Sequence, residues 1–350
     1  MIKGENVHRY LIDYAGKWLL YDKEKLYRPS LPELFENEKL VISEVTGKKG
    51  LIVSFDNEKF YTDHSLSCCV LKHKLSNIDQ TILRRHKIYI KEGEIELSKN
   101  YDLRYLLGFI NSKLINFYFY LMLGYELNVY PESIEEIPIY KIDFDTSKAT
   151  HDELVELVNK MISLNKQKNE ILKTFDQIIN NYPDYKTLSL KDAYYTRADY
   201  SKYIEKKAHI SAQTQGEVFG IRVYEEEDSL IFKVDSEPEI STPILELIIK
   251  DENLRLFIFY TINKFLIEKR KKKKWGKGKV IDIILEGIGT LVYPLDRINL
   301  IINEFKPKLP SHHLTKIDVE IDKTDNQIDD FSYNLYNIRE DEIKIIEGSL

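Results

Sequence analysis

Cysteine is scarce in this sequence, and its scarcity excludes several classes of protein. Only Cys68 and Cys69 occur among the 350 residues. Adjacent cysteines rarely bridge each other, so a disulfide framework is excluded, and the lack of a Cys-x-x-Cys pair excludes a zinc ribbon or finger. We therefore expect both thiols to be reduced.

Long apolar runs are also missing. No hydrophobic segment of the secretory type follows Met1, and the most apolar stretch, residues 254–267, is interrupted by Arg255, Asn263 and Lys264. Such a stretch is too short and too polar to span a bilayer. These features predict a cytoplasmic protein without a membrane partner.

The chain has no overall excess of positive charge, since its formal net charge is −6. Binding of nucleic acid over the whole surface is therefore not expected, because phosphates are neutralised by Lys and Arg. Basic residues are instead concentrated at positions 48–49, 84–87 and 269–279. Local positive faces remain compatible with the acidic total.

The first part of the chain has the pattern of a small β unit with packed helices. Short apolar segments separated by glycine and polar turns predict mostly antiparallel strands between residues 39 and 74. Alternating apolar residues around Gly93 predict a hairpin over residues 88–97. A helix is expected to begin near Asp102 and to pack against the sheet.

A long helix is expected over residues 151–181, with Thr150 as its N-cap and Glu153 in the capping-box position. Its apolar residues recur every seven positions, which is typical of a coiled-coil seam. The two series are Leu154, Met161 and Phe175, and Leu157, Leu164, Ile171 and Ile178. The seam could pack against its own domain or form an intermolecular or interdomain coiled coil.

The remaining sequence predicts a second α+β unit. We expect a hairpin over residues 217–235, a helix over 245–267, a buried strand over 280–288 and a helix over 295–305. The acidic C-terminal region should end in a helical turn. The predicted α+β protein thus has a recognition domain at 1–150, a long helix at 151–182, a second unit at 183–310 and a tail at 311–350.

Several stretches, taken in order, carry a resemblance to a known family. They are KGENVHRY at residues 3–10, WLLYD at 18–22, LPELFENEKLVISEVTG at 31–47, YLLGFINSKLINFYF at 105–119, VYPESIEEIPIY at 129–140 and FSYNLYNIREDEIKIIEGS at 331–349. This order resembles the C-terminal target-recognition region of adenine-specific DNA methyltransferases of the TaqI-like and type IIG restriction-modification class. The region from about 190 to 310 matches nothing that we recognise.

The resemblance implies recognition of a specific sequence in double-stranded DNA for a methyltransferase catalytic domain or subunit. Enzymes of this class hold the flipped base with an Asn/Asp-Pro-Pro-Tyr/Phe loop, but none of the ten prolines here is adjacent to another. No glycine-rich turn is convincing for S-adenosylmethionine. We therefore expect no catalytic residue and no cofactor in this chain. The chain would be either an excised portion of an enzyme or a separate subunit. S-adenosylmethionine is then expected in the missing or partner catalytic domain.

Candidate DNA-binding residues are those that supply positive charge, amide or hydroxyl groups, or a stacking ring. The resemblance contributes Arg9 and Arg28. The charge clusters contribute Thr46, Lys48, Lys49, Arg84, Arg85, Lys87, Lys271, Lys272, Lys273, Lys274 and Trp275. Solvated turns and helix ends are the alternative interpretation of the same clusters.

Three other functions are compatible with the sequence. One is a specificity subunit of a type I restriction-modification system, in which recognition domains and long helices alternate. Another is a magnesium-dependent nuclease, for which Pro183-Asp184 with Glu205 and Lys207 has the required residue types. The last is a protein-interaction scaffold without DNA affinity.

Overall fold

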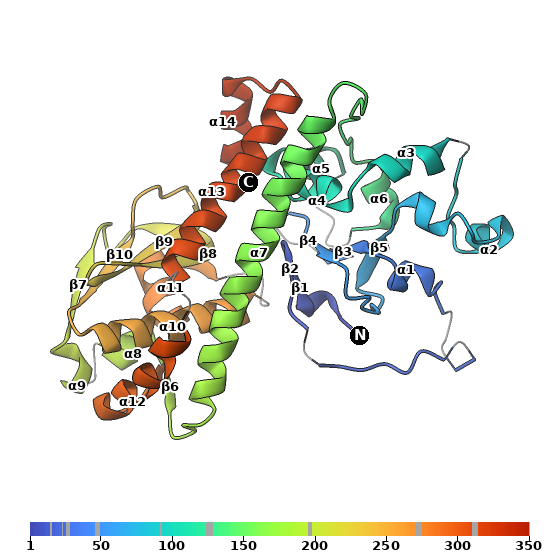
Figure 1. Cartoon of the computed structure of the whole chain (residues 1–350). Coiled ribbons are helices and arrows are strands. Elements are labelled where there is room, and N and C mark those ends of the chain that lie inside the picture. Colours follow the sequence, from blue (N-terminus) through green and yellow to red (C-terminus); the bar gives the residue numbers. More distant parts are fainter. Residues whose placement is uncertain are drawn as a thin grey trace. The chain divides into compact units, whose positions relative to one another are not determined.

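The structure is a computed structural model that describes residues 1–14, 16–22, 24–25, 29–45, 50–91, 93–123, 129–194, 198–270, 275–309 and 314–349. The chain forms two compact units (Figure 1). The first unit comprises Met1–Lys166 and Glu320–Leu350, and the second comprises Gln167–Val319. Both combine helices with antiparallel strands, so the predicted α+β class is confirmed.

The first unit is built on a three-stranded antiparallel sheet. The central strand β3 (Lys39–Ser43) is buried along its whole length and pairs with β4 (Val53–Asp56) and β5 (Leu66–Cys69). A short hairpin of β1 (Val7–His8) and β2 (Leu11–Ile12) precedes the sheet. The small antiparallel unit predicted from the sequence is therefore confirmed.

A fully buried ion pair joins two strands of this sheet. Lys39 and Asp56 face each other in the β3–β4 register, and their side chains are both 0% exposed. The Lys39 ammonium also donates to the Phe35 carbonyl at 2.7 Å, while Asp56 accepts from the backbone N–H groups of Glu58 and Phe60 at 2.7 and 2.9 Å. These bonds compensate the desolvation that buried charges require.

Short helices surround the sheet, and two long helices each contribute part of their length to this unit. Their bounds are η1 (Gly4–Asn6), α1 (Glu33–Glu36), η2 (Lys72–Leu75), α2 (Gln80–Arg85), α3 (Glu94–Asn100), α4 (Leu103–Asn111), α5 (Lys113–Leu123), α6 (Pro131–Glu135), α7 (Lys148–Ile179), α13 (Leu314–Leu335) and α14 (Glu340–Ser349). The core of the unit combines β3 and β4 with α4, the first part of α7 and Ile328 of α13. The C-terminal segment thus supplies part of the first unit's core.

Two local predictions in this unit were inaccurate. The hairpin predicted over residues 88–97 was wrong, because helix α3 begins at Glu94 with Gly93, at φ +82°, as its N-cap. Only a few residues alternate there, and the same Ile-Glu-Leu sequence is compatible with a helix. The helix expected near Asp102 was confirmed, with Asp102 accepting from the Arg104 N–H at 2.8 Å, but it ends at Asn111 and α5 begins anew at Lys113.

The long helix α7 exists, although it begins at Lys148. The assignment of Thr150 and Glu153 to an N-cap and capping box was therefore wrong. Leu154 and Met161 lie in the core of the first unit. In the second unit, Phe175 packs against Tyr260 at a ring-centroid distance of 5.4 Å. These seam residues thus pack within both units of the chain, and an intermolecular coiled coil is not tested.

The second unit contains a five-stranded antiparallel sheet in the order β11-β8-β9-β10-β7. Its strands are β7 (Ile204–Ala208), β8 (Gln215–Glu226), β9 (Ser229–Glu237), β10 (Leu245–Ile249) and β11 (Gly276–Lys279). A separate pair consists of β6 (Lys186–Ser189) and β12 (Gly289–Val292). The hairpin predicted over residues 217–235 is confirmed by β8 and β9.

The helices of the second unit are α8 (Leu190–Tyr194), α9 (Ala198–Ser201), α10 (Glu252–Arg270), α11 (Val280–Gly287), α12 (Leu295–Phe305) and η3 (Lys306–Lys308). The helix over 295–305 was predicted correctly. The one predicted over 245–267 was partly wrong, because its first residues form β10. The strand predicted over 280–288 was wrong: the buried residues Val280, Ile281, Ile284 and Leu285 follow a helical spacing.

Candidate nucleic-acid interface

Three basic side chains are presented at the end of α2. Leu83 is fully buried in a small apolar cluster with Leu31 and Leu75, which fixes the orientation of the helix. Arg84, Arg85 and Lys87 are all exposed. We call these three residues the basic cluster. The arrangement follows from the sequence, because one buried leucine places its charged neighbours on the solvent side.

Local hydrogen bonds hold both ends of α2. At its start, the Asp79 carboxylate accepts from the Thr81 N–H at 2.7 Å, and this bond lowers the pKa of Asp79. At its end, the Lys87 N–H donates to the Arg84 carbonyl at 3.0 Å and Lys87 adopts φ +59°. Arg84 and Arg85 are therefore carried on the last turn of a capped helix, and Lys87 follows directly after its C-cap.

The basic cluster is available to an external anion. Within the described ranges, Arg84, Arg85 and Lys87 form no ion pair with an acidic side chain. Guanidinium groups bind phosphate or the guanine edge in a bidentate geometry, and ammonium groups bind phosphate as point charges. This surface can therefore neutralise a phosphate backbone.

An exposed aromatic residue follows the basic cluster and was missed in the sequence. The Tyr89 side chain is 64% exposed, whereas its neighbours Ile88 and Ile90 pack partly against the cluster around Leu83. An apolar residue on each side of Tyr89 is the sequence signal that could have identified the tyrosine as exposed. A tyrosine beside arginines offers stacking and a hydroxyl in addition to charge.

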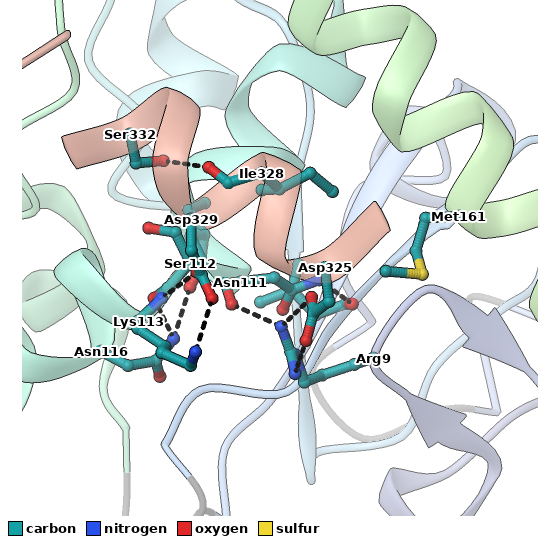
Figure 2. Close-up of polar contacts among 12 residues, drawn as sticks. Arg9, Asn111, Ser112, Lys113, Asn116, Met161, Asp325, Ile328, Asp329 and Ser332 are labelled. Atoms are coloured by element: carbon teal, nitrogen blue, oxygen red, sulfur yellow. Dashed lines mark hydrogen bonds and ion pairs between the residues drawn. The ribbon is translucent and has the colours of Figure 1, made fainter. Parts of the chain in front are cut away.

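Arg9 lies in a polar network within the first unit, shown in Figure 2. Its two terminal nitrogens donate to the Asp325 carboxylate at 3.1 and 2.8 Å, and one also donates to the Asn111 carbonyl at 2.7 Å. Burial alone would lower the pKa of Arg9, but attraction to Asp325 raises it above its ordinary value. Arg9 therefore has a structural partner in α13, and its predicted contact with DNA stays a prediction.

A second contact in Figure 2 joins α13 to the start of α5. The Lys113 N–H donates to Asp329 at 2.8 Å, and the Lys113 ammonium lies 3.2 Å from the other Asp329 oxygen and 3.3 Å from Glu347. The Asp329 side chain is only 3% exposed, and burial raises its pKa. Two charged contacts thus fix α13 within the first unit.

The other residues predicted from the sequence lie in the second unit or outside the described residues. Trp275 belongs to the second unit, where its backbone N–H donates to the Val218 carbonyl at 3.3 Å and its ring lies 6.5 Å from that of Phe265. Arg28, Thr46, Lys48, Lys49, Lys271, Lys272, Lys273 and Lys274 lie outside the described residues. The structure therefore places Arg9, the basic cluster and Trp275, and the DNA contacts of all the candidates remain predictions.

No group of three or more His, Cys, Asp or Glu side chains in the described part of the chain could hold a metal ion. Of the residues considered for a nuclease, Asp184 lies 3.7 Å from Arg297, and Lys207 lies 3.4 Å from Glu246.

Burial raises the pKa of Cys68 and of Cys69, the latter to about 11, so neither thiol is activated as a nucleophile. In the same described ranges, no helix is both long and apolar enough for a transmembrane span.

Comparison with known proteins gives one family match. Residues 1–84 match the TaqI-like C-terminal specificity domain. No curated protein and no solved structure matches the chain. The matched segment runs from the N-terminal hairpin through the three-stranded sheet to Arg84 in the basic cluster. It confirms the resemblance to a TaqI-like recognition region and supports a DNA-specificity role for this part of the chain.

Proposed function

We propose that this chain recognises a specific sequence in double-stranded DNA on behalf of an adenine methyltransferase or another restriction-modification enzyme. The match of residues 1–84 to a TaqI-like specificity domain is the observation that carries the proposal. The exposed basic cluster supports it, because it lies at the end of the matched segment and is free of ion pairs within the described residues. Phosphate contacts from this cluster would set the register in which base edges are read.

In this proposal, methyl transfer is performed by a separate catalytic domain or subunit. The sequence has no pair of adjacent prolines from which the base-holding loop of an amino-methyltransferase could be built. The role of the chain is then to position duplex DNA, and S-adenosylmethionine is bound by the catalytic partner.

A type I specificity subunit is the second candidate, and the order of elements favours it. Such subunits alternate recognition domains with long helices. Here α7 (Lys148–Ile179) follows the elements of the N-terminal region, and α13 (Leu314–Leu335) follows those of the second unit. In this alternative the second unit would read the other half of a bipartite DNA site.

The test is selection from a randomised DNA duplex library by the full chain at two salt concentrations. Enrichment of one continuous motif supports the leading proposal, and enrichment of two motifs with a fixed spacer supports the type I alternative. Salt-sensitive binding without enrichment would contradict sequence recognition by the chain alone. A complete lack of DNA binding would favour a protein-interaction scaffold.

Magnesium provides a control within the same experiment. A nuclease would cleave the bound duplex when magnesium is added, and the cleavage would disappear in Asp184→Ala. We expect the duplex to remain intact, because the described residues hold no group of acidic side chains suited to a metal ion.

A further inference from the structure

The second unit has an open depression beside its edge strand. Its volume is about 360 Å³, and its lining comes from β11, the residue before it and α11. The lining residues are Trp275, Gly278, Lys279, Asp282, Ile283, Glu286 and Gly287. The combination of an indole ring, two carboxylates and an ammonium is unlike an ordinary apolar packing defect.

The aromatic wall of the depression is Trp275, whose backbone is anchored to the neighbouring strand. The Trp275 backbone N–H donates to the carbonyl of Val218 on β8 at 3.3 Å, and its ring lies 6.5 Å from the Phe265 ring. The ring nevertheless lines the open depression. An indole ring that lines an open depression can stack on a planar ligand.

One face of α11 supplies carboxylate groups to the depression. Asp282 and Glu286 are four residues apart in the helix, so their exposed carboxylates lie on the same side. Glu286 is 2.8 Å from the Lys191 ammonium, whereas Asp282 has no ion-pair partner in the described part of the chain. The depression therefore presents hydrogen-bond acceptors next to the aromatic ring.

The edge strand adds positive charge and an accessible backbone. β11 is the terminal strand of the five-stranded sheet, and Lys277 and Lys279 flank Gly278 along it. A Cβ atom placed on Gly278 would meet no atom within 4 Å, so the backbone can be approached closely. In the sequence, residues 268–279 contain eight basic residues out of twelve.

We propose that this depression binds one unpaired nucleobase of a DNA strand, with guanine preferred. Trp275 stacks on the base, Asp282 and Glu286 accept its N–H groups, and Lys277 and Lys279 contact the flanking phosphates. Guanine is preferred because its N1–H and N2 amino group are adjacent donors that one carboxylate can accept together, whereas thymine has a single N–H between two carbonyls. This inference rests on the proposed function only in taking DNA as the source of the base.

An alternative occupant is the Lys or Arg side chain of a peptide, since aromatic rings and carboxylates also bind cations. The charge of the strand argues against it. Lys277 and Lys279 lie beside the depression, and four consecutive lysines precede Trp275 in the sequence. These residues would repel a basic peptide and attract a polyanion.

Tryptophan fluorescence gives a direct test. The chain has two tryptophans, so Trp18→Phe leaves Trp275 as the only one. The probes are thymidine oligonucleotides of about twelve nucleotides, either unchanged or carrying one central guanine. We expect the guanine probe to quench Trp275 and to bind about 10-fold more tightly than the all-thymine probe. A mononucleotide, dGMP, should bind more weakly than the guanine oligonucleotide.

Variants separate the contributions. Asp282→Asn/Glu286→Gln should remove the preference for guanine, while Lys277→Gln/Lys279→Gln should weaken both probes and lower the salt slope by about 0.7 for each phosphate that is no longer neutralised. In the wild-type background, Trp275→Ala should weaken binding of the guanine probe about 5- to 150-fold, measured by anisotropy. Lys186→Gln/Lys202→Gln is the matched control, because it removes two exposed ammonium groups of the same unit that do not line the depression.

Equal quenching by both oligonucleotides, unchanged in the carboxylate variant, would overturn base recognition. Equal affinity for dGMP and the oligonucleotide would overturn the strand as the source, and quenching by oligolysine alone would overturn the nucleic-acid assignment. The duplex selection distinguishes the two proposals. Enrichment of a motif without any Trp275 quenching refutes only this inference, whereas guanine-selective quenching without motif enrichment refutes only the proposed function.

Discussion

The Arg9 guanidinium forms a bidentate ion pair with Asp325, a residue 316 positions further along the chain. This pair connects the segment that matches the specificity domain to helix α13. Lys113 and Asp329 make a second connection between α5 and the same helix. The C-terminal helices are therefore part of the first unit and not an appended tail.

Removal of either partner should destabilise the first unit. We expect Arg9→Ala and Asp325→Ala each to lower the free energy of unfolding by about 1–3 kcal/mol, the range for a hydrogen bond to a charged group. The side chains are 37% and 26% exposed, so solvent screening favours the lower end. Urea denaturation of the single and double variants should show a positive coupling energy; additive effects would contradict the pair. Arg339→Ala, which removes a more exposed ion pair, is the control.

The basic cluster should determine the salt dependence of DNA binding. Arg84→Ala/Arg85→Ala/Lys87→Ala is expected to reduce the slope of log affinity against log salt by about 0.9 for each phosphate that the variant no longer neutralises. The measurement is a titration with one duplex at several salt concentrations. Lys25→Ala/Lys99→Ala/Lys141→Ala removes the same charge from other exposed positions of the first unit. Equal slopes for the two triple variants would show that the cluster does not contact DNA.

Gly50→Ala should destabilise the first unit by about 2–3 kcal/mol. Gly50 has φ +76°, and a Cβ atom there would overlap the Asn116 side-chain oxygen, which accepts from the Leu51 N–H at 2.6 Å. The cost combines left-handed strain of about 1–2 kcal/mol with about 1 kcal/mol for the hydrogen bond. Gly93→Ala is the matched control, since φ is +82° but the added Cβ meets nothing within 4 Å. Similar shifts in Tm for both variants would exclude a specific role of Asn116.

The ionisation of Asp329 should make the stability of the protein depend on pH. Burial raises its pKa in the folded protein above the ordinary 3.8. The folded state then retains the proton to higher pH, so the free energy of unfolding decreases as pH rises from about 3.8 through the raised pKa. Asp329→Asn should remove this decrease. Urea midpoints measured across the acidic range would test it, and an unchanged profile would contradict the assignment.

Ionisation of Asp102 should have the opposite effect on the pH dependence of stability. Burial alone would raise its pKa, but hydrogen bonds from Arg104 hold it below the ordinary value. The stability that this carboxylate contributes is therefore complete above the ordinary pKa and is lost as pH falls through the lowered one. Asp102→Asn should flatten this part of the profile, which lies below the window of Asp329. Unfolding monitored below pH 4 would detect it.

Local patterns predicted the fold where several signals agreed. Helix α12 was placed correctly because apolar residues at helical spacing lie between Pro294 and Pro307. The strands β3, β4 and β5 were found from apolar segments and turn residues. The pattern failed at residues 88–97 and 280–288, where a short apolar series was compatible with either a strand or a helix. Burial of one face of α11 decided the second case.

The candidate site was predictable only where its residues are neighbours in the sequence. Arg84, Arg85 and Lys87 were identified as one cluster and are exposed together. No sequence pattern could show that Arg9 pairs with Asp325, because their proximity depends on the docking of α13. The same limit applies to the Trp275 depression, which needs the fold to bring α11 beside the edge strand.

The discontinuity of the first unit has a consequence for its synthesis. Domains generally fold as their residues leave the ribosome, yet residues 320–350 of this unit are translated after the entire second unit. The segment that matches the specificity domain is translated before the second unit, and Asp325, the partner of its Arg9, is translated after that unit. A nascent chain will therefore hold an incomplete first unit until residues 320–350 have been translated, whereas the continuous second unit can fold before them.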